Sequence, residues 1–330
     1  MYFLRWCKKV SICGNEVIRQ TAYCYVEGSY CQKWIHNKVS QNLMNQASYN
    51  HDLSPSRVDK TIALEGKEDY RLSCGMLKNN RTEYASPQRN MLRIIGGRPS
   101  LQGKWPWQVA ILNRFKESFC GGTLVSPKWV LTAAHCVKRR LYVRLGEHDL
   151  SHVEGTELQM RVKKSIIHPS YNPETVDNDV ALLRLPYAVP LETFGIACLP
   201  KSRQPLPTQN LCTIIGWGKR STSHKQGTDI LHEAEVPIVP TKLCREVYEE
   251  YQITSNMICA GYRHGRSDAC SGDSGGPLLC KNANGQWTVF GITSFGEGCG
   301  KRGKYGIYAK LSNYVRWIRR TIGTKRMRTS

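Results

Sequence analysis

The chain has 330 residues, which is room for one large domain and a smaller one. Lysine and arginine outnumber aspartate and glutamate by 47 to 26, and the resulting formal charge of +21 attracts polyanions at long range without indicating a fold. No apolar run approaches the roughly 20 residues that a membrane-spanning helix needs, so we expect no such span.

The 14 cysteines favour an oxidising compartment, and we expect a secreted, extracellular protein. None of them has the C-x2-C spacing typical of zinc sites, so a disulfide framework is the better interpretation. Four cluster near the amino terminus, Cys74 stands alone, and nine follow Ile94. Because nine is odd, the last group needs one outside partner, and Cys74 is the only unclustered candidate.

The first 93 residues divide into two regions by composition. Residues 1–36 are cysteine-dense and predict a small module. Around Trp6 and Cys13 this module distantly resembles part of a thrombospondin type 1 repeat, and the alternative is a truncated disulfide module of another kind. Residues 37–93 predict a polar linker or propeptide that contains Cys74. The first seven residues contain too few apolar residues for a signal peptide, so we expect the beginning of the protein to be missing from this sequence.

Beyond Ile94 the pattern is one of short apolar runs broken by glycine, proline and asparagine. Close, regular spacing without helical periods between the runs predicts an all-β, barrel-like architecture. A helix is expected only at the end of the region, because Tyr314, Val315, Ile318 and Ile322 repeat at helical spacing.

The stretch Gly-Asp-Ser-Gly-Gly-Pro at Gly272–Pro277 is the strongest chemical signal. A serine hydroxyl is a poor nucleophile by itself, so Ser274 needs a base to take its proton and N–H groups to hold an oxyanion. Glycines allow the sharp turn that such an arrangement requires, and we expect the donors to be the amides of Gly272 and Ser274.

A histidine and a carboxylate that could serve Ser274 both lie at the ends of apolar runs. His135 follows the run that begins at Trp129, and Asp179 directly precedes the run that begins at Val180. Asp177 is the competing carboxylate, and we prefer Asp179 because of its place beside the apolar strand.

The order His135, Asp179, Ser274 and the residues around each resemble the chymotrypsin-like (trypsin) family of serine endopeptidases, from Ile94 to about Gly323. Within it, neurotrypsin-like secreted proteases are the nearest resemblance. The resemblance implies a domain over 94–323 of two six-stranded antiparallel β-barrels with a C-terminal helix, followed by a basic tail over 324–330. It also implies roles in acyl transfer: His135 as general base and acid, Asp179 as its orienting group and Ser274 as nucleophile.

The sequence Arg93-Ile94-Ile95-Gly96-Gly97 resembles the activation site of the same family. Cutting after Arg93 would place a new α-ammonium group on Ile94, and the family pairs that group with the carboxylate that here is Asp273. Since a buried charge without its partner is costly, the uncut chain is expected to be a zymogen with an incomplete oxyanion hole.

Substrate preference is expected to depend on Asp268, six residues before Ser274. A buried carboxylate there demands Arg or Lys before the scissile bond, and Ala269 tilts the preference towards Arg. By resemblance, Ser294 supports Asp179, while Gly296 and Gly306 keep the pocket walls open.

The resemblance also implies five disulfides. The sequence alone does not select these pairings from the other possible pairings of the cysteines. They pair Cys120 with Cys136, Cys212 with Cys280, Cys244 with Cys259, Cys270 with Cys299, and Cys74 with Cys198.

The chemistry requires no cofactor, but two ion sites are expected from the resemblance. The segment 145–157 is similar to a trypsin calcium loop, for which oxygen-only ligands are suitable; the alternative is a solvated acidic loop. Its ligands would be the carboxylates of Glu147, Glu154 and Glu157 with the carbonyls of Asp149 and His152. Tyr305 stands where the family more often has proline. In that family, tyrosine at this position accompanies a response to sodium.

The partners that we expect are protein substrates, macromolecular serine protease inhibitors and heparan sulfate, with no nucleic acid. Basic clusters at 138–140, 161–164 and 316–328 are the candidate polyanion contacts, and the alternative is a solvated basic surface without a ligand. The competing function is a catalytically inactive homologue that binds polyanions or matrix. It is disfavoured because His135, Asp179 and Ser274 are all retained.

Overall fold

The structure is a computed structural model that describes residues 74–77, 97–218, 227–265, 272–298 and 300–323. These residues belong to the larger of two compact units, which spans 61–330. The expected module at 1–36, all of the linker except Cys74–Leu77, and the basic tail at 324–330 lie outside the described residues.

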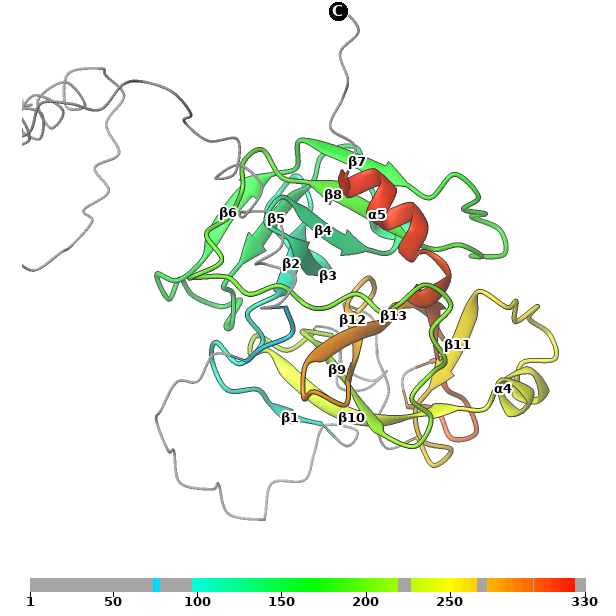
Figure 1. The fold of residues 1–330 in the computed structure, drawn as a ribbon. Helices are drawn as coiled ribbons and strands as arrows, with labels where there is room; N and C mark the ends of the chain where they lie inside the picture. Colours follow the sequence, from blue (N-terminus) through cyan, green and yellow to red (C-terminus); the bar gives the residue numbers. More distant parts are fainter. Residues whose placement is uncertain (1–73, 78–96, 219–226, 266–271, 299, 324–330) are drawn as a thin grey trace, which may run out of the picture. The chain divides into compact units, whose positions relative to one another are not determined.

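The described chain is mostly β-structure, with two α-helices and two 3-10 turns (Figure 1). In order, its elements are β1 (Arg98–Pro99), β2 (Gln108–Leu112), β3 (Ser118–Ser126), β4 (Trp129–Thr132), η1 (Ala134–Cys136), β5 (Tyr142–Leu145), β6 (Leu158–Arg161), β7 (Lys164–Ile167), β8 (Ala181–Arg184), β9 (Leu211–Gly216), β10 (His232–Val239), α4 (Thr241–Val247), β11 (Met257–Ala260), β12 (Pro277–Lys281), β13 (Trp287–Phe295), β14 (Gly306–Lys310), η2 (Leu311–Asn313) and α5 (Val315–Gly323).

The first sheet is antiparallel and has the order β6-β5-β2-β3-β4-β8-β7. Its two end strands are consecutive in the chain, since only Val162 and Lys163 separate β6 from β7. The N–H of Val162 donates to Leu141 beside β5, and the N–H of Lys163 donates to Arg184 on β8. The bend between β6 and β7 therefore curls the sheet round on itself.

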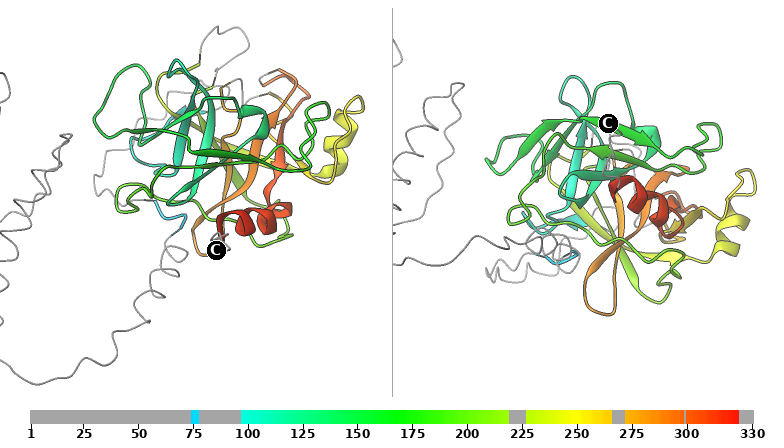
Figure 2. Two further views of the ribbon diagram at one scale, coloured as in Figure 1. Left: turned by 90° about the horizontal axis from the view of Figure 1, so that it is seen from above. Right: turned by 45° about the horizontal axis from the view of Figure 1, so that its top comes forward.

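The second sheet has the order β1-β10-β11-β14-β13-β12-β9, and β9 also pairs with β10. This extra pairing closes six strands into a barrel and leaves the short β1 as an added edge. The sequence-based prediction of an all-β, double-barrel fold with a C-terminal helix is thus confirmed, with one barrel closed and the other curled (Figure 2).

Tryptophan packing joins the two barrels. Trp105 lies on the segment before β2, and its ring contacts Trp107 at 6.0 Å and Trp287 of β13 at 4.9 Å, both edge to face. All three rings are buried in the core cluster. Burial of large aromatic surfaces is a major stabilising contribution, so this contact helps to fix the cleft between the barrels.

Helix α5 closes the chain against the first barrel. Val315 and Ile318 are buried, and the rings of Tyr314 and Trp317 contact His168, which follows β7, at 5.2 and 5.0 Å. The apolar spacing in the sequence thus defines the buried face of the helix. None of the helices in the described ranges is both long and apolar enough to cross a bilayer.

The short segment Cys74–Leu77 is fixed to the domain by covalent and backbone bonds. Cys74 is joined to Cys198, the N–H of Gly75 donates to Ile196, and the carbonyl of Gly75 accepts from Trp287. Gly75 has φ of +68°, and a Cβ there would lie 2.5 Å from the Trp287 carbonyl oxygen. Glycine is therefore required for this close approach.

A buried carboxylate attaches the beginning of the described domain to the second barrel. Glu233 on β10 is 5% exposed, and it accepts hydrogen bonds from Arg98, Lys104 and the indole of Trp105. Burial alone would raise the pKa of Glu233, but the hydrogen bonds from Lys104 and Arg98 outweigh burial and hold the pKa below its ordinary value of 4.5.

We expect Glu233→Gln to lower the free energy of unfolding by about 2 kcal/mol at pH 7, because it removes a charge-assisted acceptor. Since the folded-state pKa is depressed, the contribution of Glu233 is present above 4.5 and is lost as the pH falls through the folded-state value. The difference in free energy of unfolding between parent and variant, measured by urea unfolding, should therefore narrow as the pH falls from 4.5 through the folded-state pKa. Glu235→Gln, at an exposed position of the same strand, is the control. A difference that stays constant with pH would contradict the assignment.

Candidate active site

His135 and Asp179 meet where two paired strands end. Strand β4 pairs with β8 so that Thr132 lies opposite Ala181. This register brings His135, three positions after β4, close to Asp179, two positions before β8. His135 Nδ1 lies 2.7 Å from Asp179 Oδ2, and the His135 N–H donates to Asp179 Oδ1 at 3.0 Å. The carboxylate thus holds both the ring and the backbone of the histidine.

The second barrel adds a third donor to this carboxylate. Ser294 on β13 is buried, and its hydroxyl donates to Asp179 Oδ2. Asp179 is 1% exposed, whereas the ring of His135 is 31% exposed. The orienting acid is therefore shielded from water, while the imidazole reaches the surface where a substrate would bind.

Asp177, the competing carboxylate, is turned to other partners. It accepts a hydrogen bond from the Thr254 hydroxyl at 2.7 Å and longer ones from Asn256 at 3.4 Å. Its neighbour Asn178 has φ of +57°, and this left-handed turn sends successive side chains in different directions. Asp179, not Asp177, faces His135 in the structure.

Ser274 is held near the disulfide of Cys136 through its backbone. The carbonyl of Ser274 accepts from the N–H of Gly121 at 2.8 Å, and Cys136 Sγ lies 3.6 Å from that carbonyl and 3.7 Å from His135 Nε2. The sulfur of Cys136, in its disulfide with Cys120, therefore contacts both residues. Among the described residues, the Ser274 hydroxyl makes no hydrogen bond to His135.

Glycines shape the loop that carries Ser274. Gly272 has φ of +106°, and within the described ranges no acceptor takes the N–H of Gly272 or Ser274. The role of these two amides as an oxyanion hole stays a prediction. Gly275, on the other side, has φ of +78°, and a Cβ there would lie 2.6 Å from the Gly121 carbonyl.

Asp273 lies in a cradle made by two further glycines. Its carboxylate accepts from the N–H of Gly218 at 2.8 Å. A Cβ on Gly216 would lie 1.9 Å from Asp273 Oδ1, and a Cβ on Gly218 would lie 2.3 Å from Oδ2. The sequence analysis missed both glycines, although the pattern Gly-Trp-Gly directly after an apolar run could have indicated a close approach to another chain segment.

The two glycines expected in the substrate pocket lie beside each other. A Cβ on Gly296 would be 3.8 Å from the Cα of Gly306 on β14. The other residues predicted for specificity and activation lie outside the described residues. They are Asp268, Ala269, Arg93 and Ile94.

The structure contains four of the five expected disulfides. They join Cys74 to Cys198, Cys120 to Cys136, Cys212 to Cys280 and Cys244 to Cys259. The fifth expected pair, Cys270 and Cys299, is outside the described residues.

The acidic loop after β5 brings three carboxylates together. Glu147, Glu154 and Glu157 each have an oxygen within 4.8 Å of the others. Burial raises the pKa of Glu147 despite a 2.7 Å ion pair with Arg144. At Glu157 desolvation would raise the pKa, but hydrogen bonds from the N–H groups of Glu154 and Gly155 outweigh it and lower the pKa. The side chain of Asp149 instead accepts from Ser151, and Asp149 pairs with His152 at 3.4 Å.

One oxygen of this cluster favours a cation. Glu154 Oε1 accepts from Gln102, but the buried Oε2 has no hydrogen-bond partner among the described residues. Buried polar atoms normally have a partner, and a hard cation with oxygen ligands would supply one here. The three carboxylates therefore fit calcium.

Tyr305 is buried and its backbone is fixed by one side chain. The N–H of Tyr305 donates to the Tyr248 hydroxyl at 3.0 Å, and the same hydroxyl donates to the Tyr305 carbonyl. Tyr248 belongs to the segment after α4, which sequence analysis did not single out.

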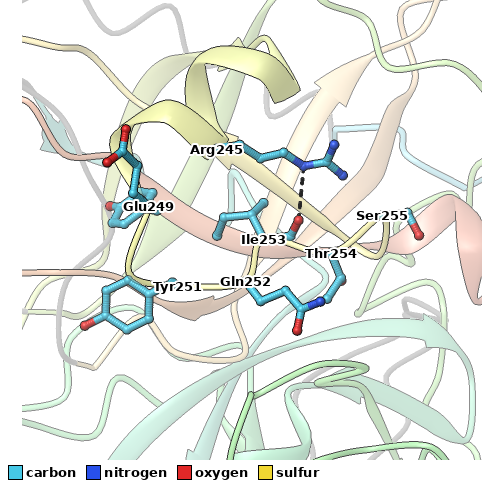
Figure 3. A pocket seen from close by; sticks show the side chains of 8 residues that line it. Arg245, Glu249, Tyr251, Gln252, Ile253, Thr254 and Ser255 are labelled. Atoms are coloured by element: carbon cyan, nitrogen blue, oxygen red, sulfur yellow. Dashed lines mark hydrogen bonds between the residues drawn. The ribbon is translucent and has the colours of Figure 1, made fainter.

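The same segment lines a pocket of about 630 Å³ beside α4 (Figure 3). Arg245 crosses the pocket to donate to the Ile253 carbonyl at 3.2 Å. Tyr251 is 46% exposed, and its ring lies 6.2 Å from Phe295, the residue after Ser294. The pocket is not lined by His135 or Ser274.

Comparison with known proteins identifies similar sequences for the larger part of the chain. The family model described as Trypsin matches residues 94–318. Vitamin K-dependent protein C of Oryctolagus cuniculus is 41% identical over 244 residues, 71% of this chain and 53% of that protein. The same protein of Mus musculus is 42% identical over 243 residues, 71% of this chain and 52% of that protein.

Transmembrane protease serine 5 of Homo sapiens is 40% identical over 238 residues, which is 69% of this chain and 51% of that protein. The chain thus spans about half the length of these curated relatives.

The cradle of Asp273 can be tested with a single methyl group. In protein cut after Arg93, Gly218→Ala would force the carboxylate away and displace the Gly272 and Ser274 amides. We expect labelling of Ser274 by a fluorophosphonate reagent to slow by about 100-fold, the cost of losing an oxyanion donor. Gly323→Ala is the matched control, because no atom lies within 4 Å of the added Cβ. Equal labelling rates in the two variants would contradict this role.

Proposed function

The chain belongs to the trypsin family, and from this premise we propose that it is a secreted serine endopeptidase that cleaves after Arg, and less readily after Lys. The observation that carries the proposal is the buried Asp179 carboxylate, which orients His135 from one barrel and accepts from Ser294 of the other. The sulfur of Cys136 contacts both the imidazole and the Ser274 carbonyl, which supports a place for Ser274 near His135. Acyl transfer to a serine requires such a base and orienting acid, with the serine hydroxyl within reach of the base.

Each residue has a distinct task in the proposed reaction. The Ser274 oxygen attacks the scissile carbonyl while His135 Nε2 takes the hydroxyl proton, and Asp179 stabilises the imidazolium that forms. The carbonyl oxygen becomes an oxyanion that accepts from the amides of Gly272 and Ser274. His135 then gives its proton to the leaving amine, and water releases the acyl group by the same steps in reverse.

We further propose that the chain is made as a zymogen and cut between Arg93 and Ile94. Support comes from Asp273, whose carboxylate lies next to the nucleophile in a space that only glycine neighbours leave open. A new ammonium group paired with Asp273 would fix the loop from Gly272 to Ser274. Specificity for Arg rests on Asp268, which would sit at the floor of the pocket.

Placement within the family rests on weaker support. A resemblance to neurotrypsin-like proteases, whose catalytic domain also ends a chain of several modules, stays a proposal. Protein substrates and protein inhibitors of serine proteases are the expected partners. The alternative function, an inactive homologue that binds polyanions or matrix, is disfavoured by the retained His135, Asp179 and Ser274.

The central experiment compares peptide substrates with Arg, Lys or Phe before a chromogenic leaving group. We expect hydrolysis only after cleavage at Arg93, with kcat/KM highest for Arg, lower for Lys and far lower for Phe. Ser274→Ala should reduce kcat by at least about 10⁴-fold, and Asp268→Ser should remove the preference for cations.

Arg93→Gln is the uncut control, and it should stay inactive under conditions that activate the parent. Failure of correctly cut, folded parent protein to hydrolyse any of the three peptides would favour the inactive homologue. Equal activity before and after the cut would overturn the zymogen proposal alone.

We propose that calcium binds the loop between β5 and β6 through Glu147, Glu154 and Glu157. Calcium would supply the buried Glu154 Oε2 with a partner and neutralise three acids for which Arg144 is the only cation within salt-bridge distance among the described residues. Sodium is proposed to act near Tyr305, whose carbonyl orientation is set by Tyr248.

Both ions can be tested in one series. Millimolar calcium, but not magnesium, should raise Tm by several degrees in the parent and by less in Glu154→Gln, while the exposed Glu174→Gln should behave like the parent. No difference between Glu154→Gln and Glu174→Gln would overturn the calcium site. For sodium, equal kcat/KM in sodium and choline chloride would count against the proposal.

A further inference from the structure

Cations that lie far apart in the sequence gather on the curled first barrel. The bend between β6 and β7 carries Arg161, Lys163 and Lys164, which sequence analysis grouped as one cluster. The structure adds residues from the neighbouring strands. We call the resulting surface the cationic face, and it comprises Lys128, Arg140, Arg161, Lys163, Lys164 and Arg184, all of them exposed.

Strand register places these cations next to one another. Lys164 lies directly opposite Arg184 in the β7–β8 pair. On the other side, Tyr142 pairs with Arg161, and the Leu141 carbonyl accepts from Val162, so Arg140 lies beside the bend. The Lys128 carbonyl accepts from Leu185, the residue after Arg184. Strands are about 4.8 Å apart, so the face extends across several adjacent strands as a continuous band.

The strands and short connections that carry the band supply no acid to balance it. Strands β5 to β8 contain no aspartate or glutamate, and neither do the connections 137–141 and 185–190. Within the described ranges, the salt bridges use Arg98, Lys104, Arg144, Lys301 and Lys304 among the lysines and arginines, and none of the six residues of the face.

Like charges directly opposite in a sheet are destabilising, so the Lys164–Arg184 pair opposes folding unless an anion lies near it. The guanidinium of Arg184 is also positioned, since it lies 6.0 Å from the ring centroid of Trp129. By contrast, Lys138 is directed to the ring of Phe119 at 3.8 Å, and we leave it out of the face.

We propose that the cationic face binds a linear sulfated polysaccharide of the heparan sulfate type. Such a chain carries anionic groups at short intervals and can follow a band that crosses the strands of a curled sheet. A flat bilayer surface would contact only part of a curled wall. The disulfides favour an extracellular location, where sulfated polysaccharide is the abundant polyanion and nucleic acid is not. We leave the α5 cations Arg316 and Arg319 out of the face, because no strand register connects them to it.

The test uses the full chain carrying Ser274→Ala, so that its result does not depend on catalysis and failure of the proposed protease function would not affect it. A site variant, Lys163→Gln with Lys164→Gln and Arg184→Gln, is compared with a control variant, Lys242→Gln with Arg316→Gln and Arg319→Gln. Both lose three positive charges at exposed positions, so the comparison tests where the charge is removed. Affinity for a size-selected heparin oligosaccharide is measured at several salt concentrations, and Tm shows that each variant is folded.

We expect the site variant to bind at least about tenfold more weakly, with a salt slope reduced by about one for each cation removed, while the control stays near the parent. Equal weakening of both variants would mean nonspecific attraction, and stronger weakening of the control would place the site on α5. Either result overturns the proposal, as would tighter binding of the parent to phosphatidylserine vesicles or duplex DNA than to heparin in the same buffer.

Discussion

The buried charge of Asp179 is the constraint on which the arrangement of the two barrels depends. A carboxylate that is 1% exposed is costly unless donors surround it, and here the donors are the ring and backbone of His135 and the hydroxyl of Ser294. The first two belong to the first barrel and the third to the second. Any slippage between the barrels would remove the Ser294 donor from this buried charge. The packing that positions the catalytic groups is therefore also packing that the acid itself demands, and β4, β8 and β13 cannot move independently.

Asp273 shows a second way to hold a carboxylate. Where Asp179 is surrounded by donors, Asp273 is confined by the absence of side chains, since Gly216 and Gly218 leave the only space that its oxygens can fill. The amides of Gly272 and Ser274 lie on either side of this residue in the chain, so the position of one carboxylate determines whether both point to a common acceptor. In the proposed mechanism, Asp179 would orient the base and Asp273 would position the oxyanion donors.

The sequence was most informative where chemistry depends on local motifs. His135 and Asp179 could be chosen because each stands at the end of an apolar run, and strand ends are rigid positions. Ser274 could be chosen because glycines flank it. The apolar spacing of α5 likewise indicated its buried face. The hydrogen bonds of Glu233 and the pairing of Lys164 with Arg184 could not be found, because they depend on the register between strands distant in sequence. The pattern Gly-Trp-Gly could have indicated a close approach, but not that Asp273 is the residue that approaches. Periodicity indicated short strands, but it could not show that β6 and β7 are one bent stretch that curls the first sheet.

The attachment of Cys74–Leu77 has a consequence for where the proposed protease would act. With Cys74 bonded to Cys198 and Gly75 seated against Trp287, the proposed cut at Arg93 would change connectivity without releasing the residues before it. Whatever those residues bind is then presented to the cleft as an intramolecular neighbour, at an effective concentration set by the length of the connection and not by diffusion from bulk solution. Two weak associations, one through the retained amino-terminal chain and one through the protease domain, would combine into a residence time that neither could give alone.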